Sequence, residues 1–393
     1  MKHIHPFPAR MAPEIALERI LKMNAGQVVL DPMVGSGMVL AVAARNGIRG
    51  IGVDLDPLAR LVSRTCSTRI DDSKARSALV QLISRAQMTD PRKICLSWMD
   101  DDKETLAFVR YWFGAKQIAQ LRALSYHLIE RPLLENGRIL RVLMVSLSRL
   151  IISKEPKASL ARDTAHSRPH RTIKQNEFDI FDALPDSLEH VLSALESDKI
   201  AVNSRTFLGD GRKLANIRTS SVDAVVTSPP YLNAIDYMRG HKFSLIWFGY
   251  RVEDLRRIRT LSIGSERSAN AEVAAGFELA AKELALDRLS SRHLRVLARY
   301  FEDLSAQLRQ TKRVLKLGGS ACYVIGNSEI RGISVANNEL LKRAGLTAGL
   351  SVLSETVRKI PDKNRYLPLP SQVGNALGKR MRTEHVLEFI KAA

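Results

Sequence analysis

The sequence predicts an α/β fold, in which an open, Rossmann-like sheet is interrupted by a largely helical insertion. Two observations support this prediction. Near the N-terminus, short strand-like segments alternate with helical segments, and a glycine-containing turn joins the first strand to its helix. After residue 203 further strand-like segments appear, so the sheet is expected to resume there. The stretch between these parts, residues 66–202, has helical spacing in its first half.

The N-terminal part is predicted to form one βαβ unit. Prolines at positions 6, 8 and 13 make the first residues an extended arm, because proline cannot donate a backbone hydrogen bond. Gly47 is placed to end the second helix as its C-cap. The expected elements are a helix at residues 14–23, a strand at 27–30, a helix at 38–46 and a strand at 50–54.

The turn between the first strand and its helix is a candidate ligand site. Gly35 and Gly37 allow a ligand to approach the backbone, and Asp54 stands where an acid is expected to bind ribose hydroxyls. A dinucleotide motif requires a small residue where this chain has Leu40. Asp31, directly before the turn, favours a cationic or amino-bearing ligand over a pyrophosphate. The pattern therefore argues against a dinucleotide.

A second candidate site follows the strand predicted at residues 222–227. The strand runs into Pro229 and Pro230, where ladder pairing must stop, and Tyr231 lies at the tip of the rigid backbone that follows. In an open α/β sheet, ligands bind at the carboxyl ends of the strands. An ordinary strand end with two prolines would look the same, so this stretch alone leaves both interpretations open.

Composition limits the partners of the chain and its compartment. The formal net charge is +19, so a polyanionic partner is expected, most simply nucleic acid. Cys66, Cys95 and Cys322 lie far apart without a CxxC pair, which disfavours disulfides, zinc knuckles and iron–sulfur clusters, and no metal is expected. No segment is apolar enough to span a bilayer and no signal peptide is recognisable, so a cytoplasmic protein is expected.

Residues 66–202 divide into an apolar first part and a basic second part. Aromatic residues recur at helical spacing from residue 108, and residues 140–152 are strongly apolar, so these side chains are expected to form a core rather than to stack on bases. The basic part, residues 154–174, has little apolar content and is expected to be a surface loop that orders on a phosphate backbone. A solvated linker is the alternative. The candidate phosphate contacts are Arg168, Arg171 and Lys174.

Residues 233–250 leave the end of the strand at 222–227 directly, so they are expected to line the pocket or its mouth. Arg239 and Lys242 are candidate nucleic-acid contacts there. Basic residues at helical spacing between 251 and 316 fit a solvated helix face or a DNA-facing one equally well. The remaining expected elements are a strand at 320–326, a helix at 334–344 and an antiparallel pair near 350–357 and 385–389.

Four motifs resemble those of S-adenosylmethionine-dependent DNA amino-methyltransferases. DPMVGSG (residues 31–37) resembles their D-P-F-x-G-S-G loop, and TSPPY (residues 227–231) resembles their catalytic [D/N/S]-P-P-[Y/F/W] loop. HPFPAR (residues 5–10) is similar to the segment that covers the methionine end of the cofactor in some members. GDGR (residues 209–212) matches the G-D-x-R that precedes the catalytic loop. The resemblance covers residues 1–65 and 203–393 and leaves residues 66–202 unexplained.

The resemblance implies a class I methyltransferase fold, a mixed seven-stranded sheet with an antiparallel edge hairpin. Residues 1–65 and 203–393 would form the catalytic domain, and residues 66–202 an inserted region for DNA target recognition. By resemblance, Asp31 lies near the methionine amino group of S-adenosylmethionine, Asp54 holds its ribose and Asp210 faces its adenine. The residues implied to bind the cofactor are Phe7, Pro8, Ala9, Asp31, Pro32, Gly35, Gly37, Asp54, Leu55 and Asp210.

The residues implied to act in catalysis are Ser228, Pro229, Pro230 and Tyr231. The Ser228 hydroxyl and the Pro229 carbonyl would accept hydrogens of an exocyclic amino group, so that its lone pair points at the methyl donor. Tyr231 would stack on a base that has left the duplex. Carbon-5 methylation of cytosine would need a cysteine after a proline, and none of the three cysteines follows one.

Ser228 favours cytosine N4 over adenine N6 as the methylated atom, because adenine enzymes of this family more often carry Asp or Asn there. An RNA base methyltransferase and a non-catalytic nucleic-acid binder are the alternatives. Double-stranded DNA is the expected partner, and a restriction endonuclease is a candidate second partner. The expected location is the cytoplasm of a bacterium or archaeon, at the nucleoid and without a membrane.

Overall fold

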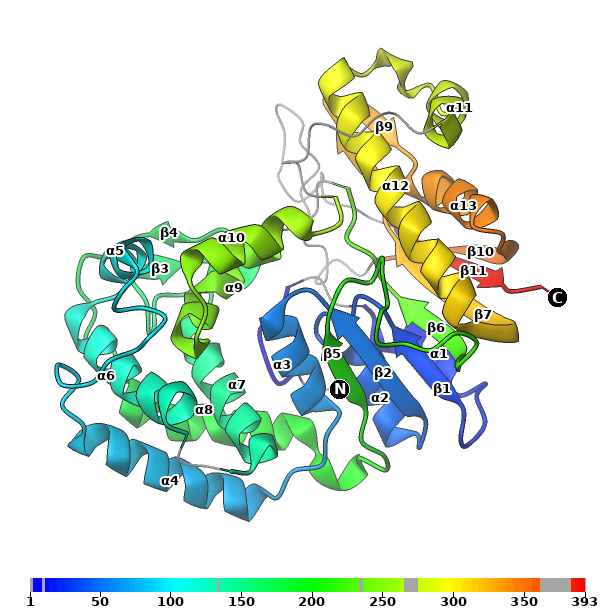
Figure 1. Cartoon of the computed structure of the whole chain (residues 1–393). Helices are drawn as coiled ribbons and strands as arrows, with labels where there is room; N and C mark the ends of the chain where they lie inside the picture. The colour runs from blue at the N-terminus through cyan, green and yellow to red at the C-terminus, as the bar shows by residue number, and fades with distance from the viewer. Residues whose placement is uncertain are drawn as a thin grey trace.

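A computed structural model describes residues 3–8, 11–132, 135–232, 236–264, 275–360 and 383–392. Within these residues the largest sheet has seven strands in the order β10-β11-β7-β6-β1-β2-β5 (Figure 1). Its strands are β1 (Val28–Asp31), β2 (Arg49–Asp54), β5 (Arg205–Leu208), β6 (Val222–Thr227), β7 (Leu315–Ile325), β10 (Ser351–Lys359) and β11 (Thr383–Ile390). The α-helices are α1 (Pro13–Ile20), α2 (Met38–Arg45), α3 (Pro57–Cys66), α4 (Asp72–Met88), α5 (Lys103–Trp112), α6 (Ala115–Ser125), α7 (Gly137–Ile151), α8 (Ile180–Leu195), α9 (Tyr237–Leu245), α10 (Val252–Leu261), α11 (Ala275–Glu283), α12 (Ser291–Val314) and α13 (Asn337–Thr347).

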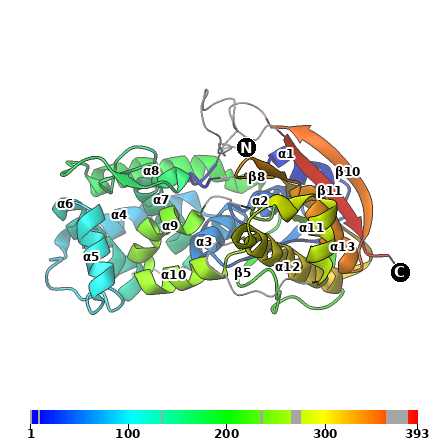
Figure 2. The same cartoon turned by 90° about the horizontal axis from the view of Figure 1, so that it is seen from above.

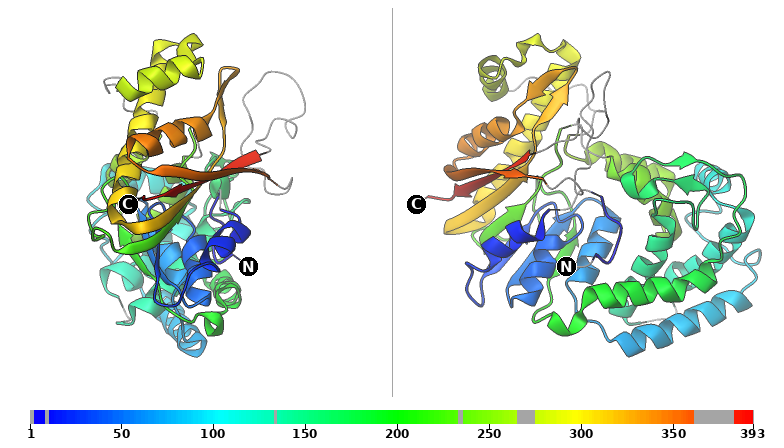
Figure 3. Two further views of the ribbon diagram at one scale, coloured as in Figure 1. Left: turned by 90° about the vertical axis from the view of Figure 1, so that its right-hand side faces the viewer. Right: turned by 180° about the vertical axis from the view of Figure 1, so that it is seen from behind.

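The sheet is mixed. Strands β5, β2, β1, β6 and β7 run parallel, with Leu30 of β1 opposite both Ile51 and Val225. Strand β11 runs antiparallel to both β7 and β10, so β10 and β11 form a hairpin at the edge. Figure 3 shows this hairpin beside α13, with the C-terminus at its end. The predicted fold class, a Rossmann-like mixed sheet with an antiparallel edge hairpin, is confirmed.

Helices cover both faces of the sheet because successive strand residues point to opposite sides. Val29 and Val226 pack into one core with α1 and α2. Leu30 and Val225, their neighbours in sequence, pack into another core with α12 and α13. β1 is therefore buried along its whole length. This burial explains why it is a continuous apolar run that ends only at Asp31.

Helices α4 to α10 form a body beside the sheet, as the view from above shows (Figure 2). Helices α4 to α8 follow β2 and precede β5 in sequence, and they share one core with α3, α9 and α10. Phe113 is almost fully buried, and its ring lies 5.2 Å from that of Trp247 in an edge-to-face contact. The expectation that the aromatic segment forms a core is confirmed there. Tyr111 differs, because it is 53% exposed.

Two predicted starts of elements are wrong, each for a reason that lies outside the segment. Strand β7 begins at Leu315 rather than 320, because Gly318 and Gly319 exchange backbone hydrogen bonds with Lys391 and pairing continues across the glycines. Helix α13 begins at Asn337 rather than 334, because Ser334 belongs to a short hairpin of β8 (Ser328–Ile330) and β9 (Ile333–Val335).

A further difference concerns the basic segment at residues 154–174. It contains a short hairpin, whereas a plain surface loop was predicted. Strands β3 (Ala161–Arg162) and β4 (His170–Arg171) pair antiparallel. Thr164 anchors the turn, since its hydroxyl donates to the Ser153 carbonyl and accepts from the Ser153 N–H at 2.8 Å. Small residues of this segment, such as Thr164 and Ser167, are buried. Among the described helices, none is long and apolar enough to cross a membrane.

Candidate active site

A cavity of about 480 Å³ opens at the carboxyl ends of β1, β2 and β6. Volumes of this size are typical of small-ligand sites, and this edge of an open α/β sheet is where such sites form. Ten of the sequence-predicted residues line it: Phe7, Asp31, Pro32, Gly35, Asp54, Leu55, Asp210, Ser228, Pro230 and Arg239. The fold thus brings together the cofactor motifs and the Ser-Pro-Pro-Tyr loop, which are far apart in sequence.

The glycine turn after β1 needs its glycines for two different reasons. Both Gly35 and Gly37 have positive φ, +46° and +80°, which side chains rarely adopt. A Cβ on Gly37 would lie 2.5 Å from the Cα of Ser63, so this glycine allows α2 to approach α3. A Cβ on Gly35 would instead lie 3.5 Å from the Phe7 ring at the cavity. Gly35 lines the cavity, whereas Gly37 serves the packing beneath it.

Asp31 and Asp54 bring two carboxylates into the cavity. Asp31 accepts hydrogen bonds from the Thr227 hydroxyl at 2.7 Å and from the Met33 N–H at 3.1 Å. Burial raises the pKa of Asp31 to about 7, and these two hydrogen bonds only partly oppose the shift. Among the described residues, neither carboxylate takes part in a salt bridge.

Two backbone N–H groups hold the Asp54 carboxylate, one from the glycine turn after β1 and one from the residue that caps α3. It accepts hydrogen bonds from the Gly35 N–H at 2.8 Å and from the Asp56 N–H at 2.9 Å. Burial, and after it the negative charge of Asp56, raises the pKa of Asp54 to about 6. Both carboxylates would therefore be stabilised by a positively charged ligand in the cavity.

Asp56 and His241 form a buried pair beside the cavity. The sequence analysis did not predict this pair. Asp56 caps α3, accepting from the Leu58 N–H at 2.8 Å, and its second oxygen is hydrogen-bonded to Nδ1 of His241. His241 is fully buried, and the Phe7 ring lies 4.8 Å from its ring. The Asp-Pro at positions 56–57 is an N-cap signal, but only the tertiary structure shows that the cap also holds a histidine.

The N-terminal arm closes one side of the cavity and is tied to the helical body. Nε2 of His5 lies 2.8 Å from the Ser148 hydroxyl of α7, to which the Ser244 hydroxyl of α9 also donates at 2.8 Å. Phe7 is buried between Tyr237 and the glycine turn, with its ring 5.6 Å from that of Tyr237. Pro8 is buried but does not line the cavity. Ala9 lies outside the described residues.

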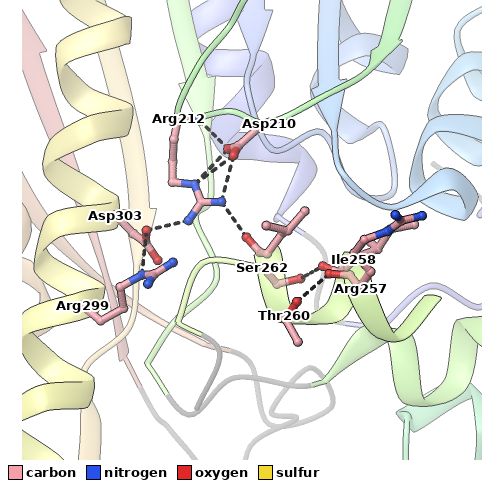
Figure 4. A network of polar contacts seen from close by, with 9 residues as sticks. Asp210, Arg212, Arg257, Ile258, Thr260, Ser262, Arg299 and Asp303 are labelled. Atoms are coloured by element: carbon pink, nitrogen blue, oxygen red, sulfur yellow. Dashed lines mark hydrogen bonds and ion pairs between the residues drawn. The ribbon is translucent and has the colours of Figure 1, made fainter. Parts of the chain in front are cut away.

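Asp210 lines the cavity as part of a polar network (Figure 4). Arg212 donates to both Asp210 oxygens, to Asp303 of α12 at 2.6 Å and to the Leu261 carbonyl of α10 at 2.7 Å. Burial alone would lower the pKa of Arg212, but the two carboxylates outweigh it and raise the pKa. Arg212 therefore connects the cavity wall to two helices that lie far away in sequence.

The Ser-Pro-Pro-Tyr loop places only part of its residues at the cavity. Ser228 lines it and donates its hydroxyl hydrogen to the Val324 carbonyl at 3.0 Å, so the serine oxygen keeps its acceptor capacity. The Pro230 carbonyl accepts from the Tyr300 hydroxyl at 3.0 Å, whereas no described residue donates to the Pro229 carbonyl. Tyr231 does not line the cavity and packs against the core beneath α12.

Basic residues surround the mouth of the cavity. Arg239 and Arg259 line it and both pair with Asp236. Lys242, one turn further along α9, has its Nζ 4.9 Å from the centre of the Phe108 ring. Burial, and then the charge of Arg259, lowers the pKa of Lys242. No described carboxylate forms a salt bridge with Lys242.

The candidate phosphate contacts of the basic segment are exposed on its hairpin. Arg168 and Lys174 point to solvent, and the Arg171 guanidinium lies 5.1 Å from the centre of the exposed Tyr111 ring. None of these residues lines the cavity. Within the described part of the chain, no group of three or more His, Cys, Asp or Glu side chains is placed to hold a metal ion.

No family model matches the chain. Its relatives include the type II methyltransferase M.MvaI of Kocuria varians, 23% identical over 96% of this chain and 88% of that protein. M.MjaII of Methanocaldococcus jannaschii, also a type II methyltransferase, is 22% identical over 69% of this chain and 66% of that protein. M.BsoBI of Geobacillus stearothermophilus is a third, 23% identical over 60% of this chain and 50% of that protein.

Two solved structures are also similar. One is a Thermus thermophilus protein described as a DNA modification methylase, crystallised with S-adenosyl-L-methionine; it has 16% identity and a TM-score of 0.26 over 47% of this chain and 52% of that chain. The other is the rRNA methyltransferase aviRa of Streptomyces viridochromogenes, with 11% identity and a TM-score of 0.30 over 98% of this chain and 88% of that chain. Scores of this size do not establish a shared function.

Proposed function

We propose that this chain is a DNA methyltransferase that transfers a methyl group from S-adenosylmethionine to an exocyclic amino group, with cytosine N4 as the preferred atom. The observation that supports it most is the shared cavity. Asp31 and Asp54 reach it from the ends of β1 and β2, and Ser228 reaches it from the end of β6. Sequence relatives that are type II methyltransferases support the same reaction class.

The cavity fits S-adenosylmethionine in size and in charge. The cofactor carries a sulfonium and an ammonium group, and neither the buried Asp31 carboxylate nor the half-buried Asp54 carboxylate forms a salt bridge with a described residue. Asp54 would accept from the ribose hydroxyls, Asp31 would face the ammonium group, and Asp210 would face the adenine. Phe7 and Gly35 form the wall between these positions. When bound, the cofactor supplies an electrophilic methyl group.

Ser228 and Pro229 would prepare the amino group for attack. An exocyclic amino nitrogen is a weak nucleophile, because its lone pair is delocalised into the base. The Ser228 oxygen, whose own hydrogen is donated to Val324, would accept one amino hydrogen, and the Pro229 carbonyl the other. Two fixed acceptors favour a tetrahedral nitrogen with its lone pair directed into the cavity. Tyr300 holds the following carbonyl, of Pro230, and so stiffens the loop.

Phosphate contacts would lie at the cavity mouth and on the basic hairpin. Lys242 forms no salt bridge with a described residue. Its charge is repelled by Arg259, Arg239 and Arg256 and attracted by Asp236. A DNA phosphate there would relieve this repulsion and would place the neighbouring nucleotide at the cavity. We extend the same role to Arg168, Arg171 and Lys174. Tyr231 would contact the flipped base only after a rearrangement, since its ring packs against the core beneath α12.

The domain division and the partners follow from this proposal. Residues 1–65 and 203–393 would carry catalysis, and residues 66–202 would recognise DNA, together with α9 and α10, which share their core. A restriction endonuclease is a candidate partner because the sequence relatives are type II enzymes. Action on chromosomal DNA would place the protein at the nucleoid.

The test is mass spectrometry of nucleosides from duplex DNA incubated with the pure protein and S-adenosylmethionine. We expect N4-methylcytosine, and Ser228→Ala should slow its formation by about 10–100-fold, since each positioned acceptor contributes a few kcal/mol. Ser221→Ala removes a hydroxyl at the amino end of the same strand and serves as the matched control.

Each alternative has its own outcome in this experiment. N6-methyladenine without N4-methylcytosine would overturn the base assignment but not the reaction class. Methyl label in RNA alone would overturn the DNA substrate. Thermal stabilisation by S-adenosylmethionine with no methylated base in either nucleic acid would favour the non-catalytic binder.

A further inference from the structure

Four arginines of α3 and α7 form a cluster that the proposed reaction does not use. Arg60 and Arg64 are one turn apart on α3, and Arg138 and Arg141 lie in the first turns of α7. The two helices pack against each other and lie side by side to the left of the sheet in Figure 1. Arg138 is exposed and the other three are half-buried.

No described residue neutralises this arginine cluster. Several other buried or half-buried arginines of the described residues form salt bridges. Arg122 pairs with Asp100, and Arg212 pairs with Asp210. Within the described residues, none of the four cluster side chains forms a hydrogen bond or a salt bridge with protein. The Nε atoms of Arg60 and Arg141 are buried without an acceptor.

The four positive charges act on one another. Burial lowers the pKa of Arg141 to about 10, and the charges that add to the effect are those of Arg64, Arg138 and Arg60. Burial also lowers the pKa of Arg64, and the charges of Arg60 and Arg138 lower it further. No carboxylate contributes to either shift. The first turn of α7 has no acidic residue, so the positive end of the helix dipole adds to the repulsion.

A merely solvated basic face does not account for this arrangement. Solvated arginines extend their guanidinium groups into water and away from each other. Here Arg141 folds back toward the start of its own helix, where its Nη1 would lie 3.5 Å from a Cβ placed on Gly137. Buried, unpaired donors and like charges held together are both unfavourable unless an anion joins them.

We propose that the arginine cluster of α3 and α7 is a phosphate-binding site separate from the cofactor cavity. The planar guanidinium group presents paired N–H donors that match phosphate oxygens, and several of them together select a doubly charged anion over chloride. The phosphate could come from the DNA backbone or from a free phosphate or pyrophosphate ion. The site shares α3 with the cavity, because Ala59 lines the cavity and Arg60 follows it.

The test uses the full chain, with sodium pyrophosphate as the probe and sodium chloride at equal ionic strength as the reference. Pyrophosphate should raise the melting temperature of the unchanged protein by about 2 °C or more. In Arg64→Gln/Arg141→Gln this rise should disappear, while the melting temperature in low-salt chloride should increase because the repulsion is gone. Arg85→Gln/Arg309→Gln removes the same charge at exposed helix positions and should keep the response.

A second arm identifies the source of the phosphate. If the DNA backbone occupies the site, the salt dependence of duplex binding should lose about two units of slope in the Arg64/Arg141 variant. If that slope is unchanged while the pyrophosphate response is lost, the ligand is a free phosphate ion. Only this arm rests on the proposed function, and a chain that methylates nothing would still show the thermal response.

The proposal fails if the Arg64/Arg141 variant responds to pyrophosphate as strongly as the unchanged protein, or if the unchanged protein does not respond. Arg138→Gln alone is the second variant, since its side chain is exposed and its loss should not disturb folding. It should weaken the pyrophosphate response by about half or more. A variant that loses stability in chloride and keeps the response would show that the arginines are structural.

Discussion

The cavity at the carboxyl ends of β1, β2 and β6 and the arginine cluster of α3 and α7 have opposite charges. In each, a set of like-charged side chains forms no salt bridge with a described residue. In a chain of net charge +19, the cavity gathers Asp31 and Asp54 and gives them hydrogen-bond donors, but no salt bridge with a described residue. The arginine cluster gathers four cations and gives them no acceptor among the described residues. The Arg212 network is different, because Asp210 and Asp303 compensate its charge.

This difference separates ligand sites from structural ion pairs. A buried pair with both charges present, such as Arg212 and Asp210, stabilises the arrangement of helices and needs no ligand. Buried charges of one sign are instead destabilising until a ligand of opposite charge binds. The four experiments below test this distinction.

The largest effect is expected from the compensated network. Arg212→Met leaves Asp210 without its cation and Asp303 with only the longer contact to Arg299, at 3.4 Å, and both carboxylates are largely buried. The variant should therefore lower the unfolding free energy by about 3–5 kcal/mol. Urea unfolding measures this loss. Arg313→Met is the control, because Arg313 donates mainly to the neutral carbonyls of Leu214 and Ile217 and should lose less. Equal losses in the two variants would contradict the assigned role.

In the absence of cofactor, Asp31→Asn should raise the unfolding free energy of the protein, and the gain should be larger at high pH. Its carboxyl has a pKa of about 7 in the fold against 3.8 as the ordinary value, so the fold binds more protons than the unfolded chain between these values. Stability should therefore fall as pH rises from 4 to 7, by about 4 kcal/mol at most. The asparagine variant should lack this loss.

Urea unfolding at pH 5 and pH 8 checks this expectation, and Asp100→Asn gives the opposite sign. Burial alone would raise the pKa of Asp100, but the hydrogen bonds from Arg122 and Leu96 outweigh it and lower the pKa. Removing that carboxylate should therefore destabilise the protein at pH 8 and have less effect as pH falls toward the folded pKa. The same slope in both variants would refute the assignment of Asp31.

Asp54→Ala should weaken S-adenosylmethionine binding and leave the fold intact. A charged hydrogen bond to the ribose is worth roughly 1.5–3 kcal/mol, so the dissociation constant should rise at least about tenfold. Titration calorimetry measures it. Asp223→Ala, at the amino end of strand β6, is the control and should bind normally. Unchanged affinity in Asp54→Ala would remove this residue from the site.

The smallest effect per residue is expected at the basic hairpin. Replacing Arg168, Arg171 and Lys174 with glutamine should flatten the salt dependence of DNA binding by about one unit of slope per contact and leave cofactor affinity unchanged. Gel-shift titrations at several salt concentrations measure the slope. A full slope in the triple variant would identify the hairpin as a linker that stands clear of DNA.

Much of the fold and of the cavity could be predicted because the signals are local. The apolar run of β1, the positive-φ glycines of the turn after it, and the prolines after β6 each depend on residues close together in sequence. Since strands that end in such turns meet at one edge of the sheet, Asp31, Asp54 and Ser228 could be expected to converge. The structure places all three at one cavity.

The errors arose where a partner outside the predicted segment decides the local structure. Strand β7 continues through Gly318 because Lys391 bonds to this stretch, and Ser334 is in a strand because Glu329 pairs with it. The hairpin at residues 161–171 is ordered through Ser153, outside the basic run. Polar composition predicts an exposed segment there, but it does not reveal that Thr164 is buried and hydrogen-bonded to the backbone of Ser153.

The sequence alone thus predicted the strands of the sheet, the order of the motifs along the chain and the Asp31 and Asp54 carboxylates of the cavity. Each of these depends on the type and spacing of residues that are close together in sequence. Only the tertiary structure decided which charges are compensated. Arg212 meets Asp303, and Asp56 meets His241, across long separations, whereas Arg64 and Arg141 lie near Arg60 and Arg138 and form no salt bridge with a described residue. Periodicity shows which face of a helix is buried, but the partner that faces it depends on how the helices pack.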